Sequence, residues 1–209
     1  MENTEVTYLI RSVSGAPSWE TVPRLAIDRV LWTPDCGIRA AGQLCHDTEV
    51  LYVHLQAAER EIRAEYTAPL SRVCEDSCLE FFFMPENETR YFNFEINPNG
   101  CLWIGFGHGR EDSTVLVPKN IPALFGIRTA RTREGWEVFY RIPCSFLRLF
   151  WPDFTFSGVL RANLYKCGEK TPEEHYLSWS PVSSETPDFH RPVDFGKMVF
   201  EQSSLQHGR

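Results

Sequence analysis

Hydrophobic and polar residues alternate most regularly between residues 73 and 101. In residues 78–83 and 91–97, a period of two places successive side chains on opposite faces of a sheet, so both segments are predicted to be strands. Residues 85–90, PENETR, are polar and begin with proline, which predicts a surface hairpin turn between them. One face of this hairpin is apolar, and the other carries Cys78, Glu80, Phe82, Tyr91, Asn93, Glu95 and Asn97.

Most other segments have a similar short pattern bounded by turn residues. Residues 144–150 are the one segment predicted to form a helical turn, whereas residues 111–124 and 168–195 are predicted to be loops. About ten short strands with almost no helix indicate an all-β fold, an antiparallel β-sandwich with one short helix. Besides the hairpin, strands are predicted at residues 6–10, 39–45, 50–56, 102–106, 125–132, 136–142, 158–167 and 198–200.

Length and charge narrow the classes of protein that this chain can belong to. The 209 residues contain no linker, repeat or low-complexity block, so we expect a single domain over residues 1–209. The net charge of -7 argues against nucleic-acid and anionic-membrane partners, because both require basic patches. The sequence does not predict an oligomeric state.

The N-terminus and the cysteines suggest a compartment. Residues 1–5, MENTE, do not start a signal peptide, and no run of 18 apolar residues is present. We therefore expect a cytoplasmic protein, or an extracellular one if a leader has been removed. The seven cysteines are then expected to be free structural thiols, since the Cys74-x3-Cys78 pair lacks partners at zinc-like spacing.

The polar face of the predicted sheet is the candidate binding surface. Carboxylate, amide and guanidinium groups pair well with sugar hydroxyls, and aromatic rings cover the C–H side of a sugar. A solvated face is the alternative interpretation, because antiparallel sheets often leave one side wet. Phe82 indicates that a ligand, a loop or a subunit covers the face. If the strands are neighbours, the face holds Tyr52, His54, Gln56, Glu80, Tyr91, Asn93, Glu95, Arg161, Asn163 and Tyr165.

Six segments in the same order resemble the family 9 carbohydrate-binding modules, which have DOMON-like, jelly-roll-like sandwiches. The resemblance covers residues ~20–200 and is greatest to stand-alone bacterial members. It implies a saccharide gripped between two rings, with contributions from Glu80, Asn163 and Trp179. It also implies structural calcium, for which Asp28, Asp47 and Glu75 are candidate oxygen ligands. The segments are VCEDSCLEFFF, YFNFEINPNG, GWEVFYRIP, RANLYKCG, SWSP and FGKMVF.

One position departs from the family pattern. The first clamping ring of xylanase-linked members lies about six residues before the motif glutamate, and Cys74 occupies that place here. Phe189, Trp103 and Tyr91 are the rings that could replace it. Trp179 could instead fill the end of the core, and Glu80 could be a structural acid paired with Arg161.

Three functions are compatible with these residues. The first is a non-catalytic carbohydrate-binding protein that recognises a mono- or oligosaccharide, and we favour it on the polar face and the resemblance. The second is a glycoside hydrolase in which Glu80 and Glu95 are the acid and the base. The third is an assembly module whose polar face is a subunit interface.

Overall fold

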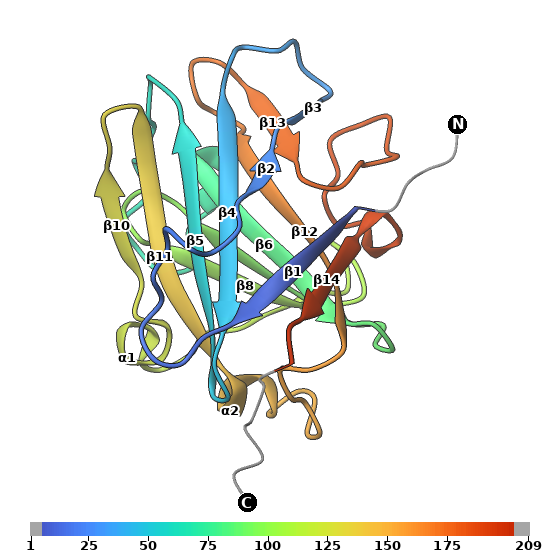
Figure 1. The fold of residues 1–209 in the computed structure, drawn as a ribbon. Helices are drawn as coiled ribbons and strands as arrows, with labels where there is room; N and C mark the ends of the chain where they lie inside the picture. The colour runs from blue at the N-terminus through green and yellow to red at the C-terminus, as the bar shows by residue number, and fades with distance from the viewer. Residues whose placement is uncertain (1–5, 203–209) are drawn as a thin grey trace, which may run out of the picture.

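A computed structural model describes residues 6–202 and shows two curved sheets packed face to face (Figure 1). We call the first the site sheet. Its strands follow the spatial order β14 (Gly196–Phe200), β12 (Val159–Gly168), β6 (Cys78–Pro85), β7 (Tyr91–Ile96), β8 (Leu102–Gly107) and β9 (Thr114–Val115). At one end of β12, β13 (His175–Ser178) adds a further strand, which pairs in turn with β3 (Arg29–Leu31).

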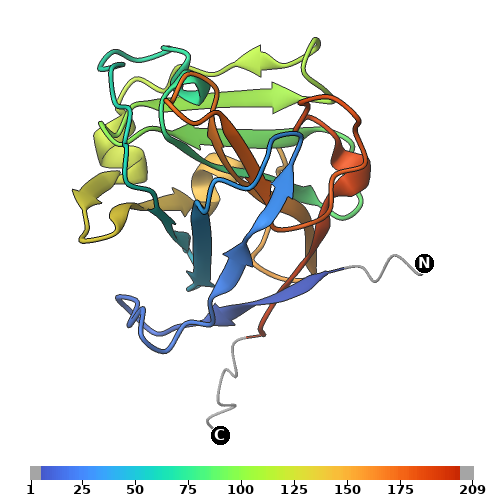
Figure 2. The same ribbon diagram turned by 90° about the horizontal axis from the view of Figure 1, so that it is seen from above.

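The second sheet, which we call the back sheet, is joined to the site sheet by β1 (Thr7–Ser12). β1 pairs in parallel with β14 through its first part and with β4 through its last two residues, so the predicted sandwich is confirmed but is not purely antiparallel. Figure 2 shows the green strands of the site sheet on one side of the molecule and β1 on the other. The back sheet follows the order β10 (Arg128–Arg131), β11 (Gly135–Pro143), β5 (Val50–Ala58), β4 (Arg39–His46) and β2 (Leu25–Ile27).

The core lies between the sheets and is rich in aromatic rings. In the predicted hairpin, Phe81 pairs with Phe94 across β6 and β7, and both side chains are fully buried. The ring of Phe94 also stacks at 6.2 Å on Tyr140 of the back sheet. The apolar half of the alternation is therefore the half that closes the sandwich, as the sequence predicts.

Helical structure is slightly more extensive than predicted. The helical turn predicted after Pro143 is confirmed as α2 (Cys144–Leu147), and two 3-10 turns occur at η1 (Val73–Glu75) and η2 (Pro192–Asp194). A second helix, α1 (Ile121–Phe125), lies where a loop was expected, and Asn120 caps its N-terminus by accepting from the backbone N–H of Ala123. Neither α-helix of the described chain is long and apolar enough to span a membrane.

Polar side chains also enter the interior, at one end of the sandwich. Lys166 of β12 is fully buried, and its ammonium contacts the Glu59 carboxylate at 3.2 Å. It also donates to the Cys167 carbonyl at 2.9 Å and contacts His175 Nε2 at 2.7 Å. Three partners match the three N–H bonds of a lysine ammonium, so this buried charge is fully satisfied.

Candidate functional site

The register of the site sheet places the predicted polar residues in adjacent rows on its outer face. One row crosses four strands and consists of Tyr165, Glu80, Glu95 and Trp103, each directly opposite the next. The next row consists of Asn163, Phe82, Asn93 and Gly105. Directly paired residues have Cβ atoms about 5 Å apart, so the polar groups of the rows form one surface.

A pocket of about 360 Å³ opens over these rows. Glu80, Asn93 and Glu95 line it from the sheet, and Cys167 lines it from the end of β12. This volume is within the usual range for small-molecule pockets. The pocket is also lined by Trp32, Arg72, Val73, Cys74, Trp103, Arg110, Ser113, Val115, Glu169, Tyr176, Pro187, Asp188, Phe189 and His190.

Aromatic rings stand at two opposite sides of the pocket. Trp32, Tyr176 and Phe189 form one cluster, in which the Trp32 ring lies 5.4 Å from Tyr176 and 5.5 Å from Phe189. Trp103 belongs to β8, which is four strands away from β13, or about 19 Å along the sheet. Trp32 has a positive φ of 54°, an uncommon conformation for a bulky residue, and its indole N–H donates to the Ser184 carbonyl at 2.8 Å.

The part of the pocket lined by the strands is rich in hydrogen-bond acceptors. Asn93 donates its amide N–H to Glu95 at 2.7 Å, while its buried Oδ1 has no hydrogen-bond partner in the described chain. Burial raises the pKa of Glu95 to about 7. Burial, followed by the neighbouring charge of Glu95, raises the pKa of Glu80 well above its usual value. A protonated carboxyl group both donates and accepts hydrogen bonds, so these groups are suited to a ligand with hydroxyl groups, which also do both.

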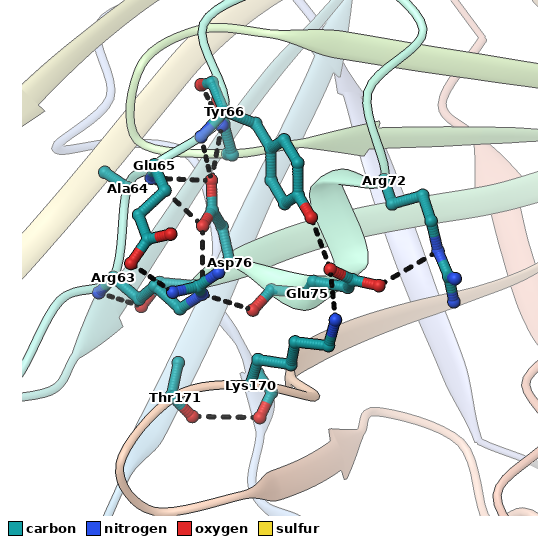
Figure 3. Close-up of polar contacts among 12 residues, drawn as sticks. Arg63, Ala64, Glu65, Tyr66, Arg72, Glu75, Asp76, Lys170 and Thr171 are labelled. Carbon is teal, nitrogen blue, oxygen red and sulfur yellow. Dashed lines mark hydrogen bonds and ion pairs between the residues drawn. The ribbon is translucent and has the colours of Figure 1, made fainter.

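An ion-pair network fixes the segment that carries Cys74 at the edge of the pocket. Figure 3 shows Arg72 and Lys170 reaching the carboxylate of Glu75 from different directions, at 3.1 and 2.9 Å. The neighbouring Asp76 accepts from the backbone N–H groups of Glu65 and Tyr66 and from the amide of Asn97. The Asp76 carboxylate thus has the backbone-capping role expected of an aspartate beside a turn.

A loop of the protein itself covers the rest of the polar face. Phe82 is fully buried, because Tyr165 packs edge-on against it at 5.0 Å and the His190 ring lies at 5.1 Å. Tyr91 is hydrogen-bonded to His190 Nδ1 at 2.7 Å, and Arg110 contacts Asp188 at 3.3 Å. The loop after β13 therefore covers the part of the face around Phe82 and Tyr91, beside the pocket.

Nearly the whole sequence matches the model of one protein family. The model of the family described as "Carbohydrate-binding family 9" matches residues 16–200. The chain belongs to carbohydrate-binding family 9. No curated protein sequence matches it.

Three solved structures resemble this family 9 chain. A candidate carbohydrate-binding protein from Bacteroides uniformis ATCC 8492 is 27% identical with a TM-score of 0.81, and the match covers 95% of this chain and 100% of that one. A family 9 module from Caldicellulosiruptor kristjanssonii in complex with cellotriose is 11% identical with a TM-score of 0.69 over 97% of both chains. A structure of a family 9 module from Caldicellulosiruptor kristjanssonii in complex with glucose is 13% identical with a TM-score of 0.67, over 98% of this chain and 100% of that one.

Not all predicted site residues of this family 9 protein line the pocket. Glu80, Asn93, Glu95 and Phe189 do, whereas the other five lie beside or beneath it. Asn163 uses its side-chain amide to hold both backbone groups of Ser180, at 2.8 and 3.1 Å, and so fixes the start of the covering loop.

The remaining four predicted residues also bond to the backbone or pack against other side chains. Tyr165 stacks on Phe189 at 4.0 Å, and Arg161 donates to the carbonyl of Phe195 rather than pairing with Glu80. Trp179 is 8% exposed and packs beside Gly196, which fits a core-filling ring. Tyr91 is 1% exposed beneath His190.

Three other predicted positions lie on the wrong sheet for the site. Tyr52, His54 and Gln56 belong to β5, which is flanked by β4 and β11 of the back sheet. Tyr52 donates to Asp47, while His54 stacks on Phe139 at 4.0 Å. Alternation correctly predicts that residues 50–56 form a strand, but it does not specify which sheet the strand joins.

The sequence analysis missed several lining residues, notably Trp32, Arg110 and Tyr176. Each lies in a loop or in a strand of four residues or fewer. The short alternation in HYLS, residues 175–178, was the available signal for Tyr176, since it predicts a strand next to β12.

The candidate calcium ligands do not gather into a cluster. Asp47 accepts from the backbone N–H groups of Glu49 and Val50, and Glu75 accepts from Lys170 and Tyr66. Asp28 is exposed on the segment between β2 and β3. Among the described residues, the group of three or more His, Cys and carboxylate ligands that lie together is Cys78, Glu80 and Cys167.

Changing Tyr165 to phenylalanine is expected to lower the free energy of unfolding by about 1 kcal/mol. The Tyr165 hydroxyl donates to the Phe189 carbonyl at 3.2 Å, and its removal leaves a buried carbonyl without this donor. Urea unfolding measures the change. Tyr52→Phe is the matched control, because water can replace the part-exposed hydroxyl that Tyr52 donates to Asp47. Equal stability of Tyr165→Phe and the wild type would contradict the expectation.

Proposed function

We propose that this protein binds a mono- or short oligosaccharide in the pocket and does not catalyse a reaction on it. The observation that supports this most directly is the set of polar groups that line the pocket from the sheet, Glu80, Asn93 and Glu95, between aromatic rings on two sides. In the described chain, the buried Oδ1 of Asn93 has no hydrogen-bond partner. Sugar hydroxyls supply donors, and the C–H face of a sugar packs on rings. The cellotriose and glucose complexes of similar folds support the same class of ligand.

The electrostatics of the two carboxyl groups favour binding over hydrolysis. A glycosidase uses one protonated acid and one ionised carboxylate, and distinct environments keep them apart in pKa. Here burial raises the pKa of both Glu80 and Glu95. Membership of a family of binding modules supports the same interpretation. We expect no hydrolysis of glycosides by the wild type, so Glu80→Gln should leave the measured rate unchanged.

The same structure also disfavours a subunit interface on this face. Tyr91 and Asn93 are 1% and 2% exposed, so they offer little surface to a second chain. A standard interface buries about 800 Å² on each partner.

Calorimetric titration with glucose, cellobiose, xylobiose and sugar phosphates tests the proposal, and we expect heat from at least one of them. Trp103→Ala should weaken that binding by about 5-fold or more, because a stacked ring contributes about 1 kcal/mol or more. Trp19→Ala is the matched control, because Trp19 packs on His54 and Phe139 of the back sheet. Absence of heat with every sugar, or equal affinity of Trp103→Ala and the wild type, would overturn the proposal.

A further inference from the structure

Three buried side chains with metal-binding atoms meet where β12 and β6 border the pocket. Cys78 and Cys167 are direct partners across the two strands. Glu80 follows Cys78 by two residues, so it lies on the same face of β6. The two sulfur atoms and a Glu80 carboxylate oxygen all lie within 4.8 Å of one another. The three residues are 0%, 2% and 1% exposed for Cys78, Glu80 and Cys167.

Within the described chain, no positively charged side chain pairs with this cluster. Within the described chain, the Glu80 carboxylate accepts one hydrogen bond, from the Cys167 thiol at 2.9 Å, and has no ion-pair partner. Directly opposite Glu80 is Glu95, a second carboxyl group, whose one side-chain hydrogen bond among the described residues is the one from Asn93. Asn93 also lines the pocket, and its buried Oδ1 has no hydrogen-bond donor in the described chain. Buried polar groups of this kind are normally hydrogen-bonded or coordinate a metal.

We propose that Cys78, Glu80 and Cys167 form a binding site for a thiophilic divalent cation such as Zn²⁺. Two sulfur ligands and one carboxylate oxygen select zinc over calcium and magnesium, which prefer all-oxygen sites. Three protein ligands leave the fourth tetrahedral position free. That position faces the pocket, because Glu80 and Cys167 both line it, so a water or a ligand hydroxyl can occupy it.

Binding of the metal ion releases protons from its three ligand side chains. The ion replaces the two thiol protons, and also the carboxyl proton where Glu80 holds one, and these protons pass to the buffer. The ion binds to thiolates, so the cysteines stay reduced and no electron is transferred. Metal binding does not rest on the proposed saccharide binding, although the two would share Glu80.

The test uses the full chain, kept reduced with a non-thiol reductant and titrated with Co²⁺ and then Zn²⁺. One Co²⁺ per chain should give the intense absorption of thiolate-to-cobalt charge transfer, and Zn²⁺ should abolish it. Loss of either sulfur ligand, in Cys78→Ser or Cys167→Ser, should weaken binding by at least about 100-fold, more than the loss of an outer-shell partner. Cys36→Ser is the matched control, because Cys36 lies outside the pocket lining and should leave the signal intact.

Two results would overturn the proposal. One is absence of the charge-transfer band from the wild-type protein, a result that no folding defect of a variant can explain. The other is persistence of the band in both Cys78→Ser and Cys167→Ser. Sugar titrations repeated with EDTA separate the two proposals, because saccharide binding without metal binding refutes only the metal site.

Discussion

Replacing Lys166 with methionine is expected to lower the free energy of unfolding by about 3–5 kcal/mol, because it leaves a buried carboxylate without its countercharge. Lys166 and Glu59 have no exposed side-chain surface, and their charged groups lie 3.2 Å apart. The Glu59 carboxylate would keep only two neutral donors, the Ser77 hydroxyl at 2.9 Å and the Trp136 indole N–H at 2.5 Å. Urea or thermal unfolding measures the loss.

The environment of Lys166 explains why the effect should be large. His175, 2.7 Å from the ammonium, has its pKa lowered to about 4, first by burial and then by the lysine charge. At neutral pH the histidine is therefore uncharged and its Nε2 can accept from the ammonium. Methionine removes this hydrogen bond, the bond to the Cys167 carbonyl and the ion pair together.

Lys170 provides a matched control for the same substitution. Its side chain is 60% exposed, and its partner Glu75, 2.9 Å away, also pairs with Arg72 at 3.1 Å. Exposed ion pairs contribute about 0–1 kcal/mol, so Lys170→Met should change stability far less than Lys166→Met. Similar losses in the two variants would show that the buried network does not have the stabilising role assigned to it. Glu59→Leu combined with Lys166→Met should recover part of the loss, since it removes both charges.

Replacing Glu95 with glutamine is expected to change how stability depends on pH. The folded protein raises the Glu95 pKa from 4.5 to about 7, so the folded state holds a proton that the unfolded chain releases above about pH 4.5. The contribution of Glu95 is fully present below that pH and is lost as pH rises through about 7. A shift of this size corresponds to roughly 3 kcal/mol.

The measurement is the free energy of unfolding of the wild type and Glu95→Gln from about pH 4 to pH 8, with EDTA present. The stability of the variant relative to the wild type should increase with pH by up to about 3 kcal/mol over this range. The exposed Glu20 provides the control, because Glu20→Gln should leave the pH slope unchanged. Parallel profiles for Glu95→Gln and the wild type would refute the proposed burial of a protonated carboxyl at this position.

The period-two pattern was sufficient to predict much of the site. It placed Glu80, Asn93 and Glu95 on one face of a hairpin, and in the structure Glu80 pairs directly with Glu95, next to the pair of Phe82 and Asn93. The resemblance to family 9 identifies Cys74 as the residue in the place of a clamping ring. In the structure Cys74 lies in the 3-10 turn that lines the pocket. These predictions succeed because strand geometry is local and depends on neighbouring residues.

Other parts of the site depend on contacts that are distant in the sequence. Trp32 reaches the pocket through a left-handed backbone conformation and a bond to Ser184, 152 residues away. Asn163 resembled a ligand group on a strand, but it holds Ser180 because the covering loop folds back over β12. Neither outcome follows from periodicity, since both depend on how a loop packs on a finished sheet.

Strand β1 has a consequence for how the chain can be made. Its residue Thr7 lies opposite Lys197, so the first strand of the described fold is paired with the last one, which the ribosome synthesises much later. Until β14 emerges, the first part of β1 has no partner along the seam between the sheets. Unpaired strand edges promote association of nascent chains. The last strand therefore both completes the sandwich and ends the period during which the growing chain is most prone to aggregation.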